Sequence, residues 1–432
     1  MAAPGERTLA QVGERVGDLV RDAATVDLFT GCLARTLRRA IRRLDDGTVF
    51  AVTGDIPAMW LRDSAAQMWP YLRVCRHDAD LQDVVAGVLA RQVRYVVTDP
   101  YANAFNAAPD GAGHRTDRTD LGPWVWERKY ELDSLCYPLD LAFRFWRATG
   151  RVDHFDAWYQ RAVERILTTW TVEQDHESRS PYAFERPGGP ASDTLVRGGR
   201  GPVTAVTGMT WSGFRPSDDA CRYGYHVPAN MFAVVVLGQL AQVATEVLDD
   251  GALARRALAL RAEIDAGIAR HGIVTHPELG RIYAYEVDGL GGVCLMDDAN
   301  VPSLLAAPLL GYVDVADPIY EASRRFVLSA ANPYFYAGTA VAGIGSPHTP
   351  PRHVWPIALA VQALTSLDRD EQRETIGTLT RLAVDGAMPE SVHCDRPDVH
   401  TREWFAWADA MFCELVLSYC GLPAEPAAVV TP

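Results

Sequence analysis

The feature that most constrains the fold is the spacing of apolar residues, which recur every three or four positions along most of the chain. Near the start, Val12, Val16, Leu19 and Val20 share one face of a helix. The same spacing recurs in the segments 28–44, 84–89, 141–146, 163–170, 234–248, 253–268, 301–311, 317–328, 355–367, 371–384 and 404–420. Strand-like alternation is confined to short runs such as 282–287, and no βαβ series appears. The pattern predicts an all-α fold.

Long segments rich in glycine, proline, aromatic and acidic residues separate these helices, at 47–64, 98–128, 180–224, 288–302, 331–353 and 386–403. They alternate with the helices and do not gather at one linker. This distribution favours a single domain over residues 1–432, with twelve helices in two rings of six and short β-hairpins in the loops. We expect the loops to converge on one face and to carry the binding chemistry.

Charge and cysteine usage exclude several kinds of partner. The formal net charge of −14 at pH 7 argues against nucleic acid and anionic membranes, because phosphate groups are bound by clustered cations. Eight scattered cysteines without a CxxC pair are expected to be free thiols. The opening residues lack the apolar core of a signal peptide, and no apolar run reaches membrane-spanning length. A cytoplasmic location without a membrane partner is expected, whereas the oligomeric state stays open.

The most informative segment is TGDIPAMWLRDSAAQ, residues 53–67, where Asp55, Trp60, Arg62 and Asp63 crowd one loop. Adjacent Arg62 and Asp63 offer a fork of donors and a pair of acceptors, which suits the vicinal hydroxyls of a sugar. Trp60 offers an apolar face for the sugar ring. The alternative is structural: Asp63 caps the following helix and Arg62 pairs with a neighbour.

A second segment, residues 208–232, contains the neighbouring carboxylates Asp218 and Asp219 together with Arg215. Neighbouring carboxylates oppose each other's ionisation, so one of them can stay protonated near neutral pH and act as a general acid. A glycosidic oxygen needs such an acid when it leaves. The alternative is again the start of a helix, where aspartates are favourable.

A third segment, residues 387–412, places Glu390 in a loop and Arg402, Glu403 and Trp404 before the last helix. A loop carboxylate such as Glu390 can activate water on the face opposite the acid. Glu403 is the rival, but its position at a helix start is explained by the helix dipole. We therefore rank Glu390 above Glu403.

Further polar and aromatic residues are typical of the wall of a carbohydrate pocket, in the segments 99–106, 124–139, 296–305 and 343–359. Asp298 and His348 are the substrate-binding candidates among them. Asp297 and Asp298 with Asp395 or His393 lack the spacing of metal ligands, so no metal and no cofactor are expected.

Taken together, the motifs resemble glycoside hydrolase family 125, the exo-α-1,6-mannosidases. The segments that carry the resemblance are TGDIPAMWLRDS, DPYANAFN, WERKYELDSLCYPL, GMTWSGFRPSDDA, MDDANVPSLL, GIGSPHTP with VWPIAL, and TREWFAWADAMF. They follow the family's order and extend from about residue 50 to residue 415. The resemblance implies an (α/α)6 barrel, inversion at the anomeric carbon, no metal requirement and a mannose-containing oligosaccharide as substrate.

The resemblance also implies roles for individual residues. Asp218, chosen over Asp219, becomes the general acid and Glu390 the general base. Arg62 and Asp63 are expected to hold the terminal mannose, with His348, Asp298, Arg402 and Trp404 as further candidates. For a single displacement the two catalytic carboxyl groups should lie about 6.5–9.5 Å apart, leaving room for a water molecule.

Two other functions were weighed. A sugar epimerase or isomerase on a similar barrel would use histidines as acid and base, and His226, His348, His353 and His393 are available. A non-catalytic carbohydrate-binding protein would keep Arg62 and the tryptophans but would need no carboxylate on each face of the sugar.

Overall fold

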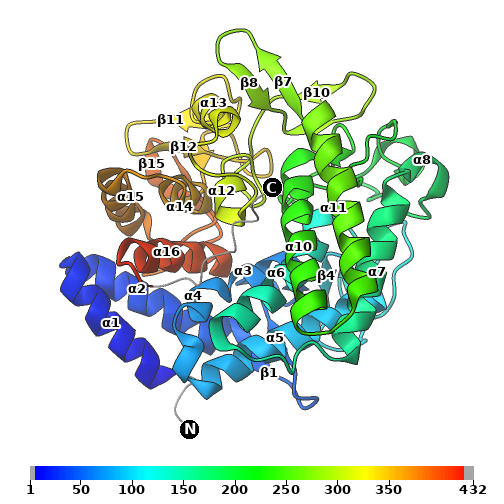
Figure 1. Ribbon diagram of the computed structural model, residues 1–432. Helices are drawn as coiled ribbons and strands as arrows, with labels where there is room; N and C mark the ends of the chain where they lie inside the picture. The colour runs from blue at the N-terminus through cyan, green and yellow to red at the C-terminus, as the bar shows by residue number, and fades with distance from the viewer. Residues whose placement is uncertain (1–4, 423–432) are drawn as a thin grey trace.

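Helices alternate between an outer and an inner ring along the chain in the computed structural model, which describes residues 5–422 (Figure 1). The inner helices are α3 (Leu61–Ala66) continued by α4 (Trp69–Leu72), α6 (Leu132–Thr149), α10 (Val227–Glu246), α12 (Ala307–Leu310), α14 (Pro356–Leu364) and α16 (Ala406–Tyr419). The outer helices are α2 (Ala23–Arg35), α5 (Ala79–Thr98), α7 (Ala157–Glu173), α11 (Gly251–His271), α13 (Pro318–Val327) and α15 (Arg369–Leu382). This arrangement confirms the expected double ring. Helix α1 (Glu6–Val20) packs on α2.

Burial distinguishes the two rings. Helix α10 is apolar around its circumference and buried on nearly all sides, whereas α15 buries only Ile376, Leu379 and Leu382. Within residues 5–422, α10 is the one helix long and apolar enough to cross a membrane, but 89% of its apolar stretch is buried inside the protein. Its hydrophobicity is therefore that of a core helix.

The two rings also begin their helices differently. Each outer helix begins at an aspartate whose carboxylate accepts a hydrogen bond from a first-turn backbone N–H, and these caps are Asp22, Asp78, Asp156, Asp250, Asp317 and Asp368. Inner helices α3, α6, α14 and α16 begin at residues whose side chains make no capping bond within the described chain, namely Trp60, Glu131, Trp355 and Phe405. The side chains at the inner helix starts are thus available for other contacts.

The connections have two distinct lengths. Inner helices lead into the next outer helices through short links such as 247–250 and 365–368. Outer helices lead back to inner ones through long segments such as 99–131 and 174–226. The long segments end where the inner helices begin, so they meet at one rim of the ring, as expected from the sequence.

Short antiparallel strands brace the long segments. They form the sheets β1 (Ile41–Arg43) with β2 (Val49–Ala51); β3 (Met59–Trp60) with β4 (Ala104–Phe105) and β5 (Val125–Glu127); β6 (Tyr225–His226) with β9 (Glu286–Val287) and β10 (Val293–Cys294); β7 (Ile273–His276) with β8 (Gly280–Tyr283); β11 (Phe335–Ala337) with β12 (Ala342–Ile344); and β13 (His353–Val354) with β14 (Ser391–His393) and β15 (Arg396–Thr401). Shorter helical turns are η1 (Thr36–Ala40), η2 (Cys75–His77), α8 (His176–Arg179), η3 (Ala191–Asp193) and α9 (Val196–Gly199).

Two local expectations differ from the structure. The strand-like run 282–287 is divided between β8 and β9, which belong to different sheets. The helix expected over 301–311 is confined to Ala307–Leu310, because the Asp297 carboxylate accepts hydrogen bonds from the backbone N–H groups of Leu304 (2.8 Å) and Leu305 (3.0 Å) and holds the preceding residues in turns.

One cluster of buried apolar side chains extends from Val16 to Leu422 through both rings. Both rings of the described chain thus share one apolar core, while the single domain over residues 1–432 stays a prediction.

Candidate active site

A cavity of about 180 Å³ lies where the inner helices begin. Its lining comes from the long segments and first helical turns, and comprises Thr53, Ile56, Trp60, Arg62, Asp63, Pro216, Ser217, Asp218, Asn300, His348, Trp355, Glu390, Arg402, Phe405 and Trp407. The segments that supply these residues are separated by hundreds of positions. The structure thus brings Asp218 and Glu390, the predicted acid and base, into one cavity.

The backbone of Asp218 fixes its position. Its φ of 66° is left-handed, a conformation that aspartate tolerates better than most residues. The conformation is held by a hydrogen bond from the Asp218 N–H to the Arg215 carbonyl (2.9 Å) and by the Lys129 ammonium, which donates to the Asp218 carbonyl (2.7 Å). Asn103 Nδ2 (3.1 Å) and an Arg62 guanidinium nitrogen (3.4 Å) donate to the carboxylate. Asp218 therefore presents one fixed carboxyl group to the cavity.

Asp219 turns away from the cavity. Its side chain is 4% exposed, accepts a hydrogen bond from Ser217 Oγ (3.3 Å) and lies 3.9 Å from His348 Nδ1. Arg215 lies outside the cavity lining too, because its guanidinium pairs with the buried Glu286 carboxylate (2.5 Å). Asp219 and Arg215 therefore make supporting contacts outside the cavity lining, whereas Asp218 lines the cavity.

Asp298 also supports the cavity from behind. One of its carboxylate oxygens accepts hydrogen bonds from the backbone N–H (3.2 Å) and side-chain amide (3.1 Å) of Asn300, and the other accepts from Ser346 Oγ (3.1 Å). Asn300 itself lines the cavity. Asp298 thus orients the lining residue Asn300 and does not itself line the cavity.

Glu390 is held on the wall by two donors. Thr401 Oγ1 donates to one carboxylate oxygen (2.9 Å), and Arg402 donates to the other (3.3 Å). The Arg402 guanidinium also contacts Thr53 Oγ1 (3.1 Å) and the exposed carboxylate of Asp55 (2.6 Å). Arg402 therefore lines the cavity and links the Glu390 loop to residues 53–55, while Asp55 acts through Arg402.

Arg62 compensates several carboxylates at once. Its buried guanidinium lies 2.5 Å from Glu131, 3.4 Å from Asp133, 3.4 Å from Asp218 and 3.6 Å from Asp63. Ion pairing of this density requires a cation that stays charged when buried, which arginine provides. Arg62 is expected to bind sugar hydroxyls, and it also compensates the negative charge of the surrounding carboxylates.

Asp63 is nearly buried in the cavity wall, and within residues 5–422 its closest charged contact is Arg62. Burial raises the pKa of Asp63, Arg62 opposes the shift and Asp218 adds to it, so the pKa reaches about 6. The carboxylate is therefore free to accept hydrogen bonds from a ligand.

Asp63→Asn is expected to stabilise the protein at pH 7 while weakening mannose binding. Because the folded protein binds this proton more tightly than the unfolded chain, ionisation of Asp63 costs stability as the pH rises from about 4 to above 6. The rise from 3.8 to about 6 corresponds to about 3 kcal/mol. Urea unfolding measures the free energy of unfolding of Asp63→Asn and wild type at pH 7 and pH 4. The variant should be more stable than wild type at pH 7, and this difference should be lost at pH 4. Equal effects at both pH values would contradict the assignment.

His348 is the histidine of the cavity. The side chain keeps 37% of its surface exposed. Partial desolvation disfavours its protonation, but the carboxylates of Asp219, Asp218 and Glu390 outweigh this effect and raise the pKa of His348 to about 9. The imidazole is therefore a cation at neutral pH and a hydrogen-bond donor toward a bound sugar.

The aromatic wall differs from expectation at one position. Trp404 points away from the cavity: its indole N–H donates to Asp409 (3.0 Å) and Arg39 lies over its ring. Trp407, one turn further into the helix, lines the cavity together with Trp60. Glu403, the rival base, is exposed at the surface. Trp404, expected among the substrate-binding residues, therefore lies outside the cavity lining, whereas Trp407 is part of it.

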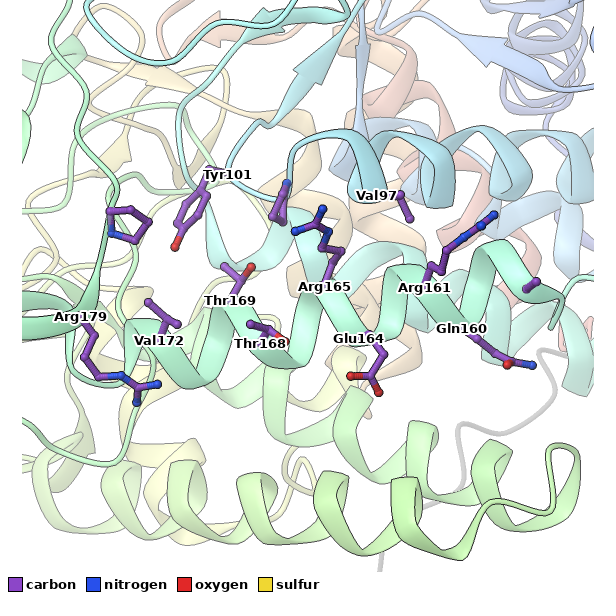
Figure 2. A pocket seen from close by; sticks show the side chains of 13 residues that line it. Val97, Tyr101, Gln160, Arg161, Glu164, Arg165, Thr168, Thr169, Val172 and Arg179 are labelled. Carbon is purple, nitrogen blue, oxygen red and sulfur yellow. The ribbon is translucent and has the colours of Figure 1, made fainter.

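A larger groove of about 820 Å³ lies elsewhere, between α5, α7 and α8, with Tyr101, Arg165 and Thr169 on its wall (Figure 2). Among the described residues that line it, Glu164 is the carboxylate, and Glu164 pairs with Arg256 (2.8 Å). This groove lacks paired acids within the described chain, so size alone does not mark the active site.

The acidic residues weighed as metal ligands lie in other contacts. The Asp297 carboxylate accepts backbone hydrogen bonds, and Asp395 pairs with Arg352 (2.5 Å). His393, Cys394 and Asp395 form a group with ligand atoms within 4.8 Å of one another, outside the residues of the cavity.

A helical double ring with two acids in one sugar-sized cavity defines a glycoside hydrolase of the helical-barrel class. A bacterial glucoamylase in complex with acarbose shares this fold at 13% identity and a TM-score of 0.63, covering 92% of this chain and 56% of that one. Residues 22–417 match the family described as metal-independent α-mannosidases, GH125. The chain belongs to this family, glycoside hydrolase family 125.

Two relatives match over nearly the whole chain. A Streptococcus pneumoniae protein, solved with α-1,6-mannobiose in a non-productive complex and described as a metal-independent α-mannosidase, is 48% identical, with a TM-score of 0.95 and coverage of 98% of this chain and 100% of that one. The meiotically up-regulated gene 157 protein of Schizosaccharomyces pombe is 38% identical over 95% of this chain and 85% of its own length.

Proposed function

We propose that the chain releases terminal, non-reducing α-1,6-linked mannose by a single displacement with inversion. Asp218 protonates the glycosidic oxygen, and Glu390 deprotonates a water molecule that attacks the opposite face of the sugar. The observation that carries this proposal is the presence of both carboxyl groups on one cavity lined by donors and aromatic rings.

The size of the cavity supports exo action. Pockets for drug-sized ligands occupy about 300–1,000 Å³, whereas this cavity has about 180 Å³. It suits one sugar ring. The α-1,6-mannobiose held by the Streptococcus pneumoniae relative supports that linkage for this chain.

The rival functions fit the site less well. An epimerase would need two histidines in the cavity, yet His226 is buried at the start of α10 and His353 lies on β13 beside His393, which leaves His348. A binding protein would have no use for two acids, Asp218 and Glu390, on the wall of one cavity.

All eight cysteines are free thiols, which supports the cytoplasmic location we propose.

Inversion predicts that β-mannose is the first product formed from an α-mannoside. Proton NMR, recorded within minutes of adding enzyme to α-1,6-mannobiose, distinguishes the anomers before mutarotation mixes them. An initial α-anomer signal would show retention and exclude the single displacement. Interconversion of free sugars without release of mannose would favour the epimerase.

A further inference from the structure

A second carboxyl group lies directly behind Asp218. Glu131 precedes the first residue of α6 and is 1% exposed, so it has no access to the cavity. Its side chain does not cap its own helix within the described chain; instead it accepts hydrogen bonds from Ser134 Oγ (2.8 Å) and Arg62 (2.5 Å). The side chain is thereby directed toward the acid site.

Glu131 and Asp218 share two donors. Asn103 Nδ2 lies 3.2 Å from a Glu131 oxygen and 3.1 Å from an Asp218 oxygen. The Arg62 guanidinium reaches Glu131 through one terminal nitrogen (2.5 Å) and Asp218 through the other (3.4 Å). Both donors hold the two carboxyl groups close to each other. Two carboxyl groups in such contact bind one proton as a pair.

The surroundings of the pair place its proton unequally. Burial raises the pKa of Glu131 well above its ordinary value, against the opposing charge of Arg62. Burial acts the same way on Asp218, but the hydrogen bond with Glu131 and the cations Arg62 and Lys129 outweigh it and hold the pKa of Asp218 below its ordinary value. The cavity acid thus lies in surroundings that favour its ionised form, although catalysis requires it to give up a proton.

We propose that Glu131 is a positioning residue that stores the proton for the general acid and returns it to Asp218 during glycoside cleavage. The inference rests on the proposed role of Asp218. The O–H bond of Glu131 breaks and its proton moves to Asp218, which passes it to the glycosidic oxygen as the bond from that oxygen to the anomeric carbon breaks and its electron pair stays on oxygen. A water oxygen bonds to the anomeric carbon while Glu390 accepts one proton from that water, so both carboxyl groups of the pair end ionised. Release of that proton and uptake of one by the pair restore the enzyme.

The test compares Glu131→Gln with wild type on two substrates. Cleavage of α-1,6-mannobiose needs an acid to protonate the leaving oxygen. Cleavage of 2,4-dinitrophenyl α-mannoside does not, because 2,4-dinitrophenolate leaves as a stable anion. We expect kcat/KM to fall more than about tenfold on mannobiose and to change less than about threefold on the aryl mannoside. The alkaline limb of the mannobiose pH profile should move to lower pH, because glutamine holds no proton for Asp218. If Glu131 had a purely structural role, its substitution would lower kcat/KM equally for both substrates and leave the alkaline limb of the pH profile unshifted.

Glu127→Gln is the matched control. Glu127 is also buried and accepts from the same Asn103 amide (3.0 Å), but its ionic contacts are with Lys129, Arg186 and His114. Any loss in this variant should be equal for the two substrates, with an unshifted pH profile. A selective loss on mannobiose in Glu127→Gln as large as in Glu131→Gln would overturn the proposal.

Two further variants separate the possible failures. Should Glu131→Gln not fold, Glu131→Asp replaces it, because aspartate retains a protonatable group. Its ratio of kcat/KM on mannobiose to kcat/KM on the aryl mannoside should equal that of wild type. A ratio as low as that of Asp218→Asn would overturn the proposal. If Asp218→Asn loses mannobiose hydrolysis while Glu131→Gln keeps the wild-type ratio and pH profile, the storage role fails alone. If Asp218→Asn hydrolyses mannobiose normally, the proposed acid itself is wrong.

Discussion

Asp218→Asn is expected to slow hydrolysis of α-1,6-mannobiose by at least about 100-fold, the contribution typical of a positioned general acid. Asparagine keeps the size of the side chain and its contacts with Asn103 and Arg62, but it has no proton to give to the leaving oxygen. Release of mannose, followed by chromatography, measures the effect. The left-handed backbone at Asp218 tolerates asparagine as well, so the fold should persist.

The leaving group and a neighbouring residue provide the controls. Hydrolysis of 2,4-dinitrophenyl α-mannoside by Asp218→Asn should remain close to wild type. Asp219→Asn changes a buried carboxylate one position away that faces Ser217 and His348, and it should lose far less activity on mannobiose. If Asp219→Asn were the more impaired variant, the acid would be Asp219 and our assignment would fail.

Glu390→Gln is expected to lower turnover of both substrates by at least about 100-fold, because water must be activated whatever the leaving group. The amide can still contact Thr401 and Arg402, so the loss reports the missing base. With the smaller variant Glu390→Ala, azide should restore cleavage of the aryl mannoside and yield β-mannosyl azide, since azide attacks without deprotonation.

The same substitution at Glu403 is the matched control for Glu390. Glu403 is exposed on the same loop, so Glu403→Gln should behave as wild type. Strong impairment of Glu403→Gln together with full activity of Glu390→Gln would exchange the two assignments.

Helical spacing predicted an all-α fold of about a dozen helices, for which a double ring was the preferred arrangement, and the family resemblance implied the same barrel. In the structure each ring has a distinct pattern. Outer helices such as α15 show one apolar stripe, and inner helices such as α10 are apolar all round. The boundaries of α12 could not be predicted from spacing. They depend on the Asp297 carboxylate, which accepts hydrogen bonds from the backbone N–H groups of Leu304 and Leu305, and helical spacing does not report such contacts.

The site residues divide in the same way. Asp218, Glu390, Arg62, Asp63 and His348 stand in recognisable motifs, and all of them line the cavity. Trp404 and Trp407 could not be ranked from the sequence, because the choice depends on where α16 begins and how it is rotated.

Supporting residues were the hardest to assign. Glu131 was missed because its partners Arg62 and Asp218 lie 69 and 87 positions away, and an acidic residue at a helix start has an ordinary explanation. A buried charge at the start of an inner helix without a capping bond is the signal that would have found it. Arg215 and Asp298 were expected at the sugar because their partners Glu286 and Ser346 lie 71 and 48 positions away in the sequence.

The aspartate caps of the outer helices have a practical consequence. They stabilise the helix starts at the rim that carries the short links, whereas the helix starts at the opposite rim line the cavity. A surface tether or fusion partner joined at links such as 247–250 would therefore sit behind the enzyme and leave the glycan entrance unobstructed. Changing the substrate range is accordingly a matter for the opposite rim, where loops can be exchanged while the caps keep the scaffold intact.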